Sequence, residues 1–288
     1  EHLAPGLALP SSNQAQLANG SRSYRIQTVN LASLHIRIKK LAGTDLIRAY
    51  QGYASYTGMG HDGKAIEPTA PLPYPLVVGE TIVEKDIALG NPVDTSKEIT
   101  LLWDEILPKD LRHAALFLDV TGTPHADAKE GRRSAQAMIQ LTDIGLAWKL
   151  TTTDAFIYAF SCDTGAPLPG VKIELIGEDA NIAGVSTTGM SGLVTIPRSD
   201  AMRHLHATLG TDGYLTAFDS TLATVGLWHF PIRYSWNKST APVRKAFLFT
   251  DRSLYRPGET VHLKGIVRRQ DGNAITAQPA APSRVVVA

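Results

Sequence analysis

Polar and apolar residues alternate along several short stretches of the chain, and this pattern predicts β-strands. The clearest case is residues 34–39, where Leu34, Ile36 and Ile38 form one face and basic residues form the other. A period of two is typical of an antiparallel strand with one buried face. The same criterion predicts strands at residues 24–30, 81–89, 98–103, 111–120, 136–141, 155–161, 171–175, 205–209, 214–218 and 246–249. Strands that recur every 8 to 12 residues or so, with turn signals between them, indicate an all-β fold of antiparallel sandwiches of about 100 residues each.

Four segments lack this alternation. Residues 1–21 contain several Pro and Gly residues without a sustained period, so we predict a tail or linker with a short helix at residues 14–18. Asp45 can cap a second short helix that runs to Tyr50. Residues 53–75 are rich in Gly and Pro and predict a long loop. Residues 122–133 are polar and predict either an interdomain linker or the tip of a long hairpin.

Turn-forming residues precede a strand at three places. The first turn is predicted at residues 163–170, which combine Asp, Gly and Pro. The second is predicted at Gly189 and Gly192, before a short strand that ends at Ile196. The third place lies within residues 247–269, where an apolar run is followed by polar residues, by Pro257-Gly258 and by an alternating strand. Because Pro presets φ and Gly tolerates positive φ, this pair predicts a tight turn between two strands.

The strands and turns divide the chain into a tail and three sandwiches. We predict a tail or linker at 1–21, sandwiches at 22–136 and 137–241, and the start of a third, truncated sandwich at 242–288. The pattern of residues 139–149 is repeated at 247–267, which indicates tandem domains built on one plan. The chain begins at Glu1 and stops within the strand-like residues Val285–Ala288. We therefore expect a fragment or processed portion of a longer protein.

Charge and composition exclude several classes of function. The chain has 28 Lys and Arg against 27 Asp and Glu, so its field favours neither nucleic acid nor an anionic membrane surface. Its single cysteine, Cys162, excludes an internal disulfide and a Cys-x-x-Cys pair for zinc or redox chemistry. No apolar run approaches the roughly 20 residues that cross a bilayer, and residues 3–10 are too short and Pro-broken for a signal peptide.

Histidine residues do not form a recognisable catalytic or metal-binding motif. His204 and His206 alternate on a predicted strand and could approach one metal ion, but without a third ligand nearby we predict surface residues. His61-Asp62 and His125 with Asp127 lie in predicted loops and have no accompanying nucleophile motif. We therefore predict no catalytic residue, no metal site and no cofactor.

The remaining candidates also have a structural explanation. Asp212-Gly213 and residues 178–181 each offer two or three oxygen ligands, whereas calcium takes about 6 to 8, so we predict turns. Cys162 is predicted to be a small buried residue near a strand end. Three Trp residues and one Tyr could line a binding face, but aromatic residues at strand ends are more often core or interdomain contacts. These four residues are Trp148, Trp228, Tyr234 and Trp236.

Several of these segments resemble one known family. Residues 247–269, with Thr-Asp-Arg-x-Leu-Tyr-Arg-Pro-Gly-Glu-Thr-Val, resemble the opening of a macroglobulin domain in the α2-macroglobulin family, particularly in its bacterial members. Residues 142–146, 162–173 and 187–194 are similar to the same pattern in the second predicted sandwich, while the first is similar only in outline. The resemblance implies tandem seven-stranded, fibronectin-like sandwiches. It also implies an architectural role for Asp251, Arg252, Tyr255, Arg256, Pro257 and Gly258.

The function that this resemblance implies is a non-catalytic N-terminal scaffold segment of a broad-range protease inhibitor or trap. Bacterial members are periplasmic and often tethered by lipid. The expected partners are target proteases, engaged through parts of the parent outside this chain, and other periplasmic envelope proteins, with inner-membrane association only through a lipid anchor. The family thioester needs a Cys-x-x-Gln-type sequence, which Cys162-Asp-Thr-Gly165 does not supply. The alternative function is a cell-surface adhesion or carbohydrate-binding array of Ig-like domains. No group of catalytic residues in the sequence supports an enzymatic function.

Overall fold

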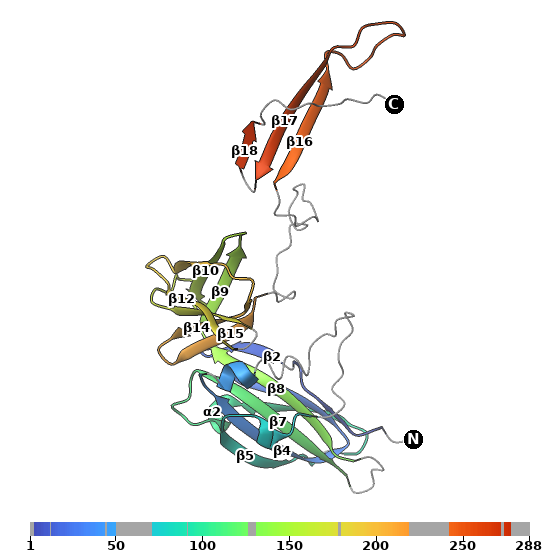
Figure 1. Cartoon of the computed structure of the whole chain (residues 1–288). Helices are drawn as coiled ribbons and strands as arrows, with labels where there is room; N and C mark the ends of the chain where they lie inside the picture. Colours follow the sequence, from blue (N-terminus) through green and yellow to red (C-terminus); the bar gives the residue numbers. More distant parts are fainter. Residues whose placement is uncertain are drawn as a thin grey trace. The chain divides into compact units, whose positions relative to one another are not determined.

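A computed structural model describes residues 3–11, 13–43, 45–49, 71–90, 92–125, 131–177, 180–218, 242–271 and 274–277. These residues form β-sheets with only short helical turns (Figure 1), which confirms the predicted all-β class. The chain divides into two compact units, Glu1–Ala223 and Thr224–Ala288, which are described separately. None of the helices in the described ranges is long and apolar enough to cross a membrane.

The first compact unit begins with a sandwich of two sheets, here called the first sandwich. One sheet has the strand order β2-β8-β7-β4-β5 and the other has the order β1-β3-β6. The strands are β1 (Gly6–Ala8), β2 (Asn13–Leu17), β3 (Ser23–Val29), β4 (Leu31–Leu41), β5 (Glu80–Ala88), β6 (Ser96–Leu102), β7 (Ala114–Pro124) and β8 (Arg133–Thr142). A 3-10 turn, η1 (Tyr74–Leu76), precedes β5, and a short helix, α2 (Trp103–Ile106), follows β6. Gly122 of β7 pairs with Arg133 of β8, so the described residues on either side of the predicted linker or hairpin tip belong to one sheet.

The core of the first sandwich follows the predicted alternation. Leu34, Ile36 and Ile38 of β4 are at most 2% exposed and pack with the inward residues of β7. Trp103 is fully buried, and its indole N–H donates a 2.8 Å hydrogen bond to Gln16 Oε1 of β2. Each large apolar side chain buried in this way stabilises the fold by roughly 1.5–3 kcal/mol. The alternation of β4 is thus sufficient to predict its inward face.

Part of the opposite face of β4, at Arg37 and Lys39, is covered, although its basic residues were expected to face outward. Arg37 lies 2.8 Å from the buried carboxylate of Asp119, and its guanidinium stacks 4.0 Å from the centre of the Tyr74 ring. The ammonium of Lys39 bonds to the Val77 carbonyl and lies 4.6 Å from the centre of the same ring. Burial of Lys39 lowers the pKa of its ammonium. Cation–π contacts and a buried carboxylate allow these basic residues to lie beneath the segment around η1.

Residues 1–21 are not a tail, and the helix predicted at residues 14–18 is wrong. β1 pairs antiparallel with β3, and β2 runs parallel to β8 with Asn13 opposite Met138. Pairing with a distant strand overrides the weak local preference of this segment. The boundary predicted at residue 136 is also wrong, because β8 pairs with β7 as far as Leu141. The described residues of the first sandwich form eight strands, and the sandwich continues to Thr142.

The second sandwich also lies in the first compact unit, and its described residues form seven antiparallel strands, the number that the resemblance implies. Its sheets have the orders β13-β10-β9 and β12-β11-β14-β15. The strands are β9 (Ile144–Leu150), β10 (Asp154–Ser161), β11 (Lys172–Gly177), β12 (Ile182–Thr187), β13 (Leu193–Pro197), β14 (Met202–Leu209) and β15 (Asp212–Ala217). Residues from both sheets, including Ile157, Ile173 and Leu205, are fully buried in its core. This sandwich therefore has a core of its own.

The second compact unit contains one described sheet, with the order β16-β17-β18. Its strands are β16 (Val243–Thr250), β17 (Leu263–Asp271) and β18 (Ala274–Ala277). The predicted Pro257-Gly258 turn is present: the N–H of Glu259 donates a 3.1 Å hydrogen bond to the Arg256 carbonyl, and Gly258 has φ +90°. A positive φ at the second central position is typical of a type II turn with Gly there.

Candidate functional site at the junction of the two sandwiches

A single residue connects the first and second sandwiches. β8 ends at Thr142 and β9 begins at Ile144, so Asp143 is the whole connection (Figure 1). The N–H of Ile144 donates a 3.1 Å hydrogen bond to Thr142 Oγ1, and both flanking residues are buried. Flexible domain boundaries normally have exposed, longer linkers. This connection therefore restricts the movement of one sandwich against the other.

An apolar cluster lies across the same junction. It joins Phe117 and Met138 of the five-stranded sheet to Ile176 and Leu215 of the second sandwich. These four side chains are at most 1% exposed. At roughly 1.5–3 kcal/mol for each fully buried side chain of this size, burial of the cluster stabilises the contact between the sandwiches.

Gln140 of β8 closes an edge of the second sandwich. Among the described strands, β15 is the last of its sheet, so the outward backbone groups of Leu215 have no partner strand there. The side-chain Nε2 of Gln140 donates to the Leu215 carbonyl at 2.8 Å, and its Oε1 accepts from the Leu215 N–H at 2.8 Å. The amide thereby takes the place of a neighbouring strand and satisfies two buried backbone groups.

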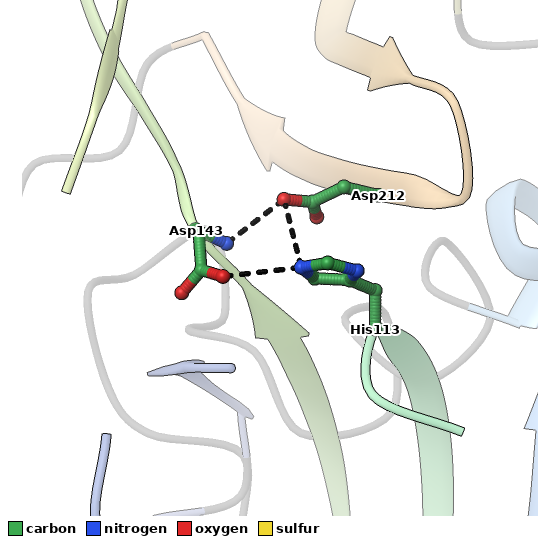
Figure 2. Close-up of side chains that lie close together, drawn as sticks. All are labelled: His113, Asp143 and Asp212. Carbon is green, nitrogen blue, oxygen red and sulfur yellow. Dashed lines mark hydrogen bonds and ion pairs between the residues drawn. The ribbon is translucent and has the colours of Figure 1, made fainter. Parts of the chain in front are cut away.

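Three polar side chains from separate elements meet beside this contact (Figure 2). His113 precedes β7, Asp143 connects the sandwiches, and Asp212 is the first residue of β15. His113 Nε2 lies 3.1 Å from Asp143 Oδ2 and 3.5 Å from Asp212 Oδ2. The backbone N–H of Asp143 also donates a 2.9 Å hydrogen bond to Asp212 Oδ2. One imidazole therefore faces two carboxylates, and the three residues were not predicted to meet.

Backbone contacts hold Asp143 in place. The N–H of Asn19 donates to Asp143 Oδ1 at 3.0 Å, and the Asp143 carbonyl accepts the N–H of Cys162 at 2.9 Å. Burial of the thiol raises the pKa of Cys162, and the carboxylates of Asp143 and Asp212 raise it further. Such a thiol is a poor nucleophile, because the thiolate is the reactive form. Cys162 as a residue is exposed in the turn after β10, so the prediction that it is buried is wrong.

A second histidine–carboxylate pair lies within the second sandwich. His206 of β14 is opposite Glu174 of β11, and its Nδ1 lies 3.0 Å from Glu174 Oε2. Burial acts to raise the pKa of Glu174, but hydrogen bonds from Lys172 and His206 outweigh it and hold the pKa below its usual value. His206 is buried rather than on the surface as predicted, because Glu174 supplies its partner. His204 lies opposite Ile176 instead.

The architectural motif of the second compact unit forms a hydrogen-bonded corner. The Tyr255 hydroxyl donates to Asp251 Oδ1, which also accepts the N–H of His262 at 3.2 Å. The same hydroxyl accepts the N–H of Arg252 at 3.0 Å, and the Arg252 guanidinium lies 4.9 Å from the centre of the Tyr255 ring. The N–H of Arg256 donates to Glu259 at 3.1 Å before the Pro257-Gly258 turn. These contacts connect the end of β16 to the residues before β17.

The aromatic and loop candidates have different outcomes. Trp148 packs edge-on against Phe218 at 6.0 Å, and its indole N–H donates to the Phe218 carbonyl, so it is partly buried against the core of the second sandwich. His125 follows β7, and its N–H bonds to the Asn30 carbonyl. The candidates that lie outside the described residues are His61, Asp62, Asp127, the pair at 178–179, Trp228, Tyr234 and Trp236.

Sequence comparisons match the chain to one group of proteins. A family model described as the MG2 domain matches residues 245–287. The α2-macroglobulin of Escherichia coli strain K12 is 29% identical over 190 residues, which are 66% of this chain and 11% of that protein. The α2-macroglobulin of Xylella fastidiosa strain 9a5c is 22% identical over 286 residues, which are 96% of this chain and 16% of that protein. The chain thus spans only a small part of the length of these relatives.

Solved structures show the same fold. A crystal structure of native α2-macroglobulin from E. coli, spanning domains NIE-MG1, matches with a TM-score of 0.59 and 13% identity, covering 75% of this chain and 97% of that one. Trypsin-activated α2-macroglobulin from E. coli matches with a TM-score of 0.58 and 20% identity, covering 96% of this chain and 18% of that one. At these identities the similarity concerns the fold, a series of sandwiches along one chain.

Proposed function

Because the chain belongs to the bacterial α2-macroglobulin family and spans a small part of its members, we propose that it is a non-catalytic scaffold segment of a broad-range protease inhibitor, or trap, that protects the cell envelope. The scaffold part of this proposal rests on the shared fold and sequence. The trapping of proteases belongs to the whole parent protein.

The observation that carries the scaffold role is the junction. Asp143 alone connects the sandwiches, an apolar cluster joins their faces, and Gln140 bonds to the edge of β15. A scaffold must hold its domains in a defined arrangement, and these contacts connect the two sandwiches directly. The MG2 match at residues 245–287 extends the series of domains along the chain.

We also propose that the segment is not an enzyme. His113 Nε2 faces two carboxylates rather than a hydroxyl or thiol that it could activate. Burial and neighbouring carboxylates raise the pKa of Cys162, which opposes nucleophilic attack by its sulfur. Both groups are better suited to structure than to covalent chemistry.

The proposed partners are target proteases, engaged through parts of the parent outside this chain, and other periplasmic envelope proteins. An E. coli relative has been solved in a trypsin-activated form, which supports proteases as partners of the parent. We place the parent in the periplasm, with any attachment to the inner membrane made through a lipid anchor. Osmotic-shock fractionation of cells that express the parent tests this location, and recovery in the cytoplasmic fraction would contradict it.

The alternative function, a carbohydrate-binding or adhesion array, depends on accessible aromatic side chains. Trp148 does not provide one, because its ring and indole N–H are both engaged by Phe218. Trp228 and Trp236 lie outside the described residues. The scaffold function is therefore the conclusion that the described contacts support best.

A two-substrate protease assay tests the proposal. Trypsin is incubated with the parent protein, with the 288-residue chain alone, or with an equal mass of albumin as a competing substrate, and cleavage of a large protein and of a small peptide is measured. We expect the parent to protect the large protein much more than the peptide, and the isolated chain to protect neither. Equal cleavage with parent and albumin would reject the trap, whereas inhibition by the isolated chain would reject the scaffold role.

A further inference from the structure

We propose that His113, Asp143 and Asp212 bind a divalent transition-metal ion, best matched by zinc, and that the ion cross-links the two sandwiches. The sequence alone predicted no metal site, because the three residues come from separate parts of the chain. His113 belongs to the first sandwich, Asp143 is the connection, and Asp212 belongs to the second sandwich. The proposal does not depend on the protease-trap function.

The spacing of the ligand atoms matches a small coordination sphere. In a tetrahedral zinc site with bonds of about 2.0–2.1 Å, neighbouring ligand atoms are about 3.3 Å apart. His113 Nε2 lies 3.1 Å from Asp143 Oδ2 and 3.5 Å from Asp212 Oδ2. One ligand atom from each residue lies within 4.8 Å of the others. Small adjustments of these side chains would therefore place all three around one ion.

A buried oxygen points independently to a missing ligand. Asp212 Oδ1 is buried without a hydrogen-bond partner among the described residues, and the Asp212 side chain is only 10% exposed. Its carboxylate points toward the imidazole of His113 (Figure 2). Buried carboxylate oxygens are normally satisfied by a donor, an ordered water or a metal ion. His113 faces Asp212 through Oδ2, so a cation that Asp212 binds through both carboxylate oxygens would also satisfy Oδ1.

Backbone N–H groups hold the carboxylates of Asp143 and Asp212 in the positions needed to bind such an ion. Asp143 Oδ1 accepts the N–H of Asn19 at 3.0 Å, which leaves Asp143 Oδ2 facing His113. Asp212 Oδ2, the oxygen nearest His113, also accepts the N–H of Asp143 at 2.9 Å, and Asp212 Oδ1 stays available as a second ligand atom of the same carboxylate. Each carboxylate thus has one oxygen fixed by the backbone, as is common for metal ligands with an ordered outer shell.

The ligand types select the class of metal. One imidazole nitrogen with two carboxylate oxygens suits zinc or a similar transition metal, whereas calcium and magnesium prefer sets made of oxygen alone. Three protein ligands leave a fourth position that water can fill. Because the ligands come from both sandwiches, an ion bound here would stabilise their contact.

Calorimetric titration and thermal unfolding of the untagged 288-residue chain test the proposal, with zinc chloride as the probe and calcium chloride in parallel. We expect about one zinc ion per chain and no comparable calcium binding. At free zinc about 100-fold above Kd, the unfolding temperature should rise by roughly 5–10 °C and return to its original value with EDTA.

The variants His113→Gln and Asp212→Asn should each lose this stoichiometric binding while retaining the far-UV circular dichroism of the folded chain. His35→Gln is the matched control, because His35 also faces two carboxylates, Glu84 at 3.2 Å and Asp86 at 2.8 Å. The side chains of these two partners are 60% and 81% exposed, so they do not form a buried site. If Asp212→Asn does not fold, His113→Gln alone decides. Absence of zinc binding, or binding that His35→Gln abolishes and His113→Gln does not, would overturn the proposal.

Discussion

Gln140 and Leu215 lie 75 positions apart in the sequence, yet the side-chain amide of one bonds to both backbone groups of the other at 2.8 Å. Gln140 lies on a strand of the first sandwich and Leu215 on the edge strand of the second. The same junction also contains the apolar cluster and the single connecting residue, Asp143. The two sandwiches therefore fold against each other with matching polar and apolar surfaces, as a scaffold requires.

Replacing Gln140 by Leu should destabilise the first compact unit. The substitution keeps much of the side-chain volume but leaves the N–H and carbonyl of Leu215 without partners in a buried contact. Because each unsatisfied buried group costs about 1–3 kcal/mol, the free energy of unfolding should fall by roughly 2–4 kcal/mol in urea denaturation. Gln27→Leu, at an exposed position of β3, is the control and should change it by less than about 0.5 kcal/mol. Equal stability of the two variants would contradict this role for Gln140.

Gly192→Ala and Gly165→Ala should differ in their effects on stability, although both glycines have similar backbone angles. Their φ values are +72° and +73°, so either substitution should cost about 1–2 kcal/mol of left-handed strain. A Cβ at Gly192 would also lie 2.5 Å from the carbonyl oxygen of Ala159, whereas a Cβ at Gly165 would meet nothing within 4 Å. We expect Gly192→Ala to lower the free energy of unfolding by at least about 1 kcal/mol more than Gly165→Ala, because overpacking typically costs ~1–3 kcal/mol. Equal losses in parallel urea titrations would show that the Ala159 contact is easily relieved.

The stabilising effect of Glu174 should depend on pH. Hydrogen bonds from Lys172 and His206 hold the pKa of Glu174 below its usual value of 4.5 in the folded chain, despite its burial. Its contribution to the free energy of unfolding is therefore fully present above about pH 5 and is lost as the pH falls through the folded-state pKa. The difference in stability between the wild type and Glu174→Gln should shrink between pH 7 and pH 4 or lower. In a His206→Gln background this pH dependence should be weaker; an unchanged difference at all pH values would contradict the shift.

Local sequence patterns were sufficient where a strand has one buried face or a turn has a fixed geometry. Leu34, Ile36 and Ile38 face the core as their spacing predicts, and Pro257-Gly258 form the expected turn. β2 could not be predicted in this way, because its backbone partner is β8, more than one hundred residues later. Its strand conformation depends on that distant pairing rather than on its own side chains.

The contacts at the junction of the two sandwiches could not be predicted either, because they also join residues that are far apart in the sequence. His113 and Asp143 are 30 positions apart, and Asp143 and Asp212 are 69 apart, so no motif spacing links them. Asp212 was considered with Gly213 as a calcium ligand and was predicted to form a turn, whereas its partners come from other elements. The only local signal was the outward face of β8, where polar Gln140 lies beside apolar Met138. A polar residue on that face predicts solvent or a partner equally well, and only the fold distinguishes them.

Tyr255→Phe should raise the pKa of Asp251 in the second compact unit. The Tyr255 hydroxyl donates a hydrogen bond to Asp251 Oδ1, and this bond is the main cause that lowers the pKa of the carboxyl below its usual value of 3.8. Phe removes the hydroxyl but keeps the ring on which Arg252 stacks, so the change isolates the hydrogen bond. In carbon-detected NMR titrations, the Asp251 midpoint should move up toward 3.8. The control Tyr214→Phe, in the second sandwich, should leave the Asp251 midpoint unchanged. An identical Asp251 midpoint in wild type and Tyr255→Phe would show that the corner is held by the Asp251–His262 backbone contact instead.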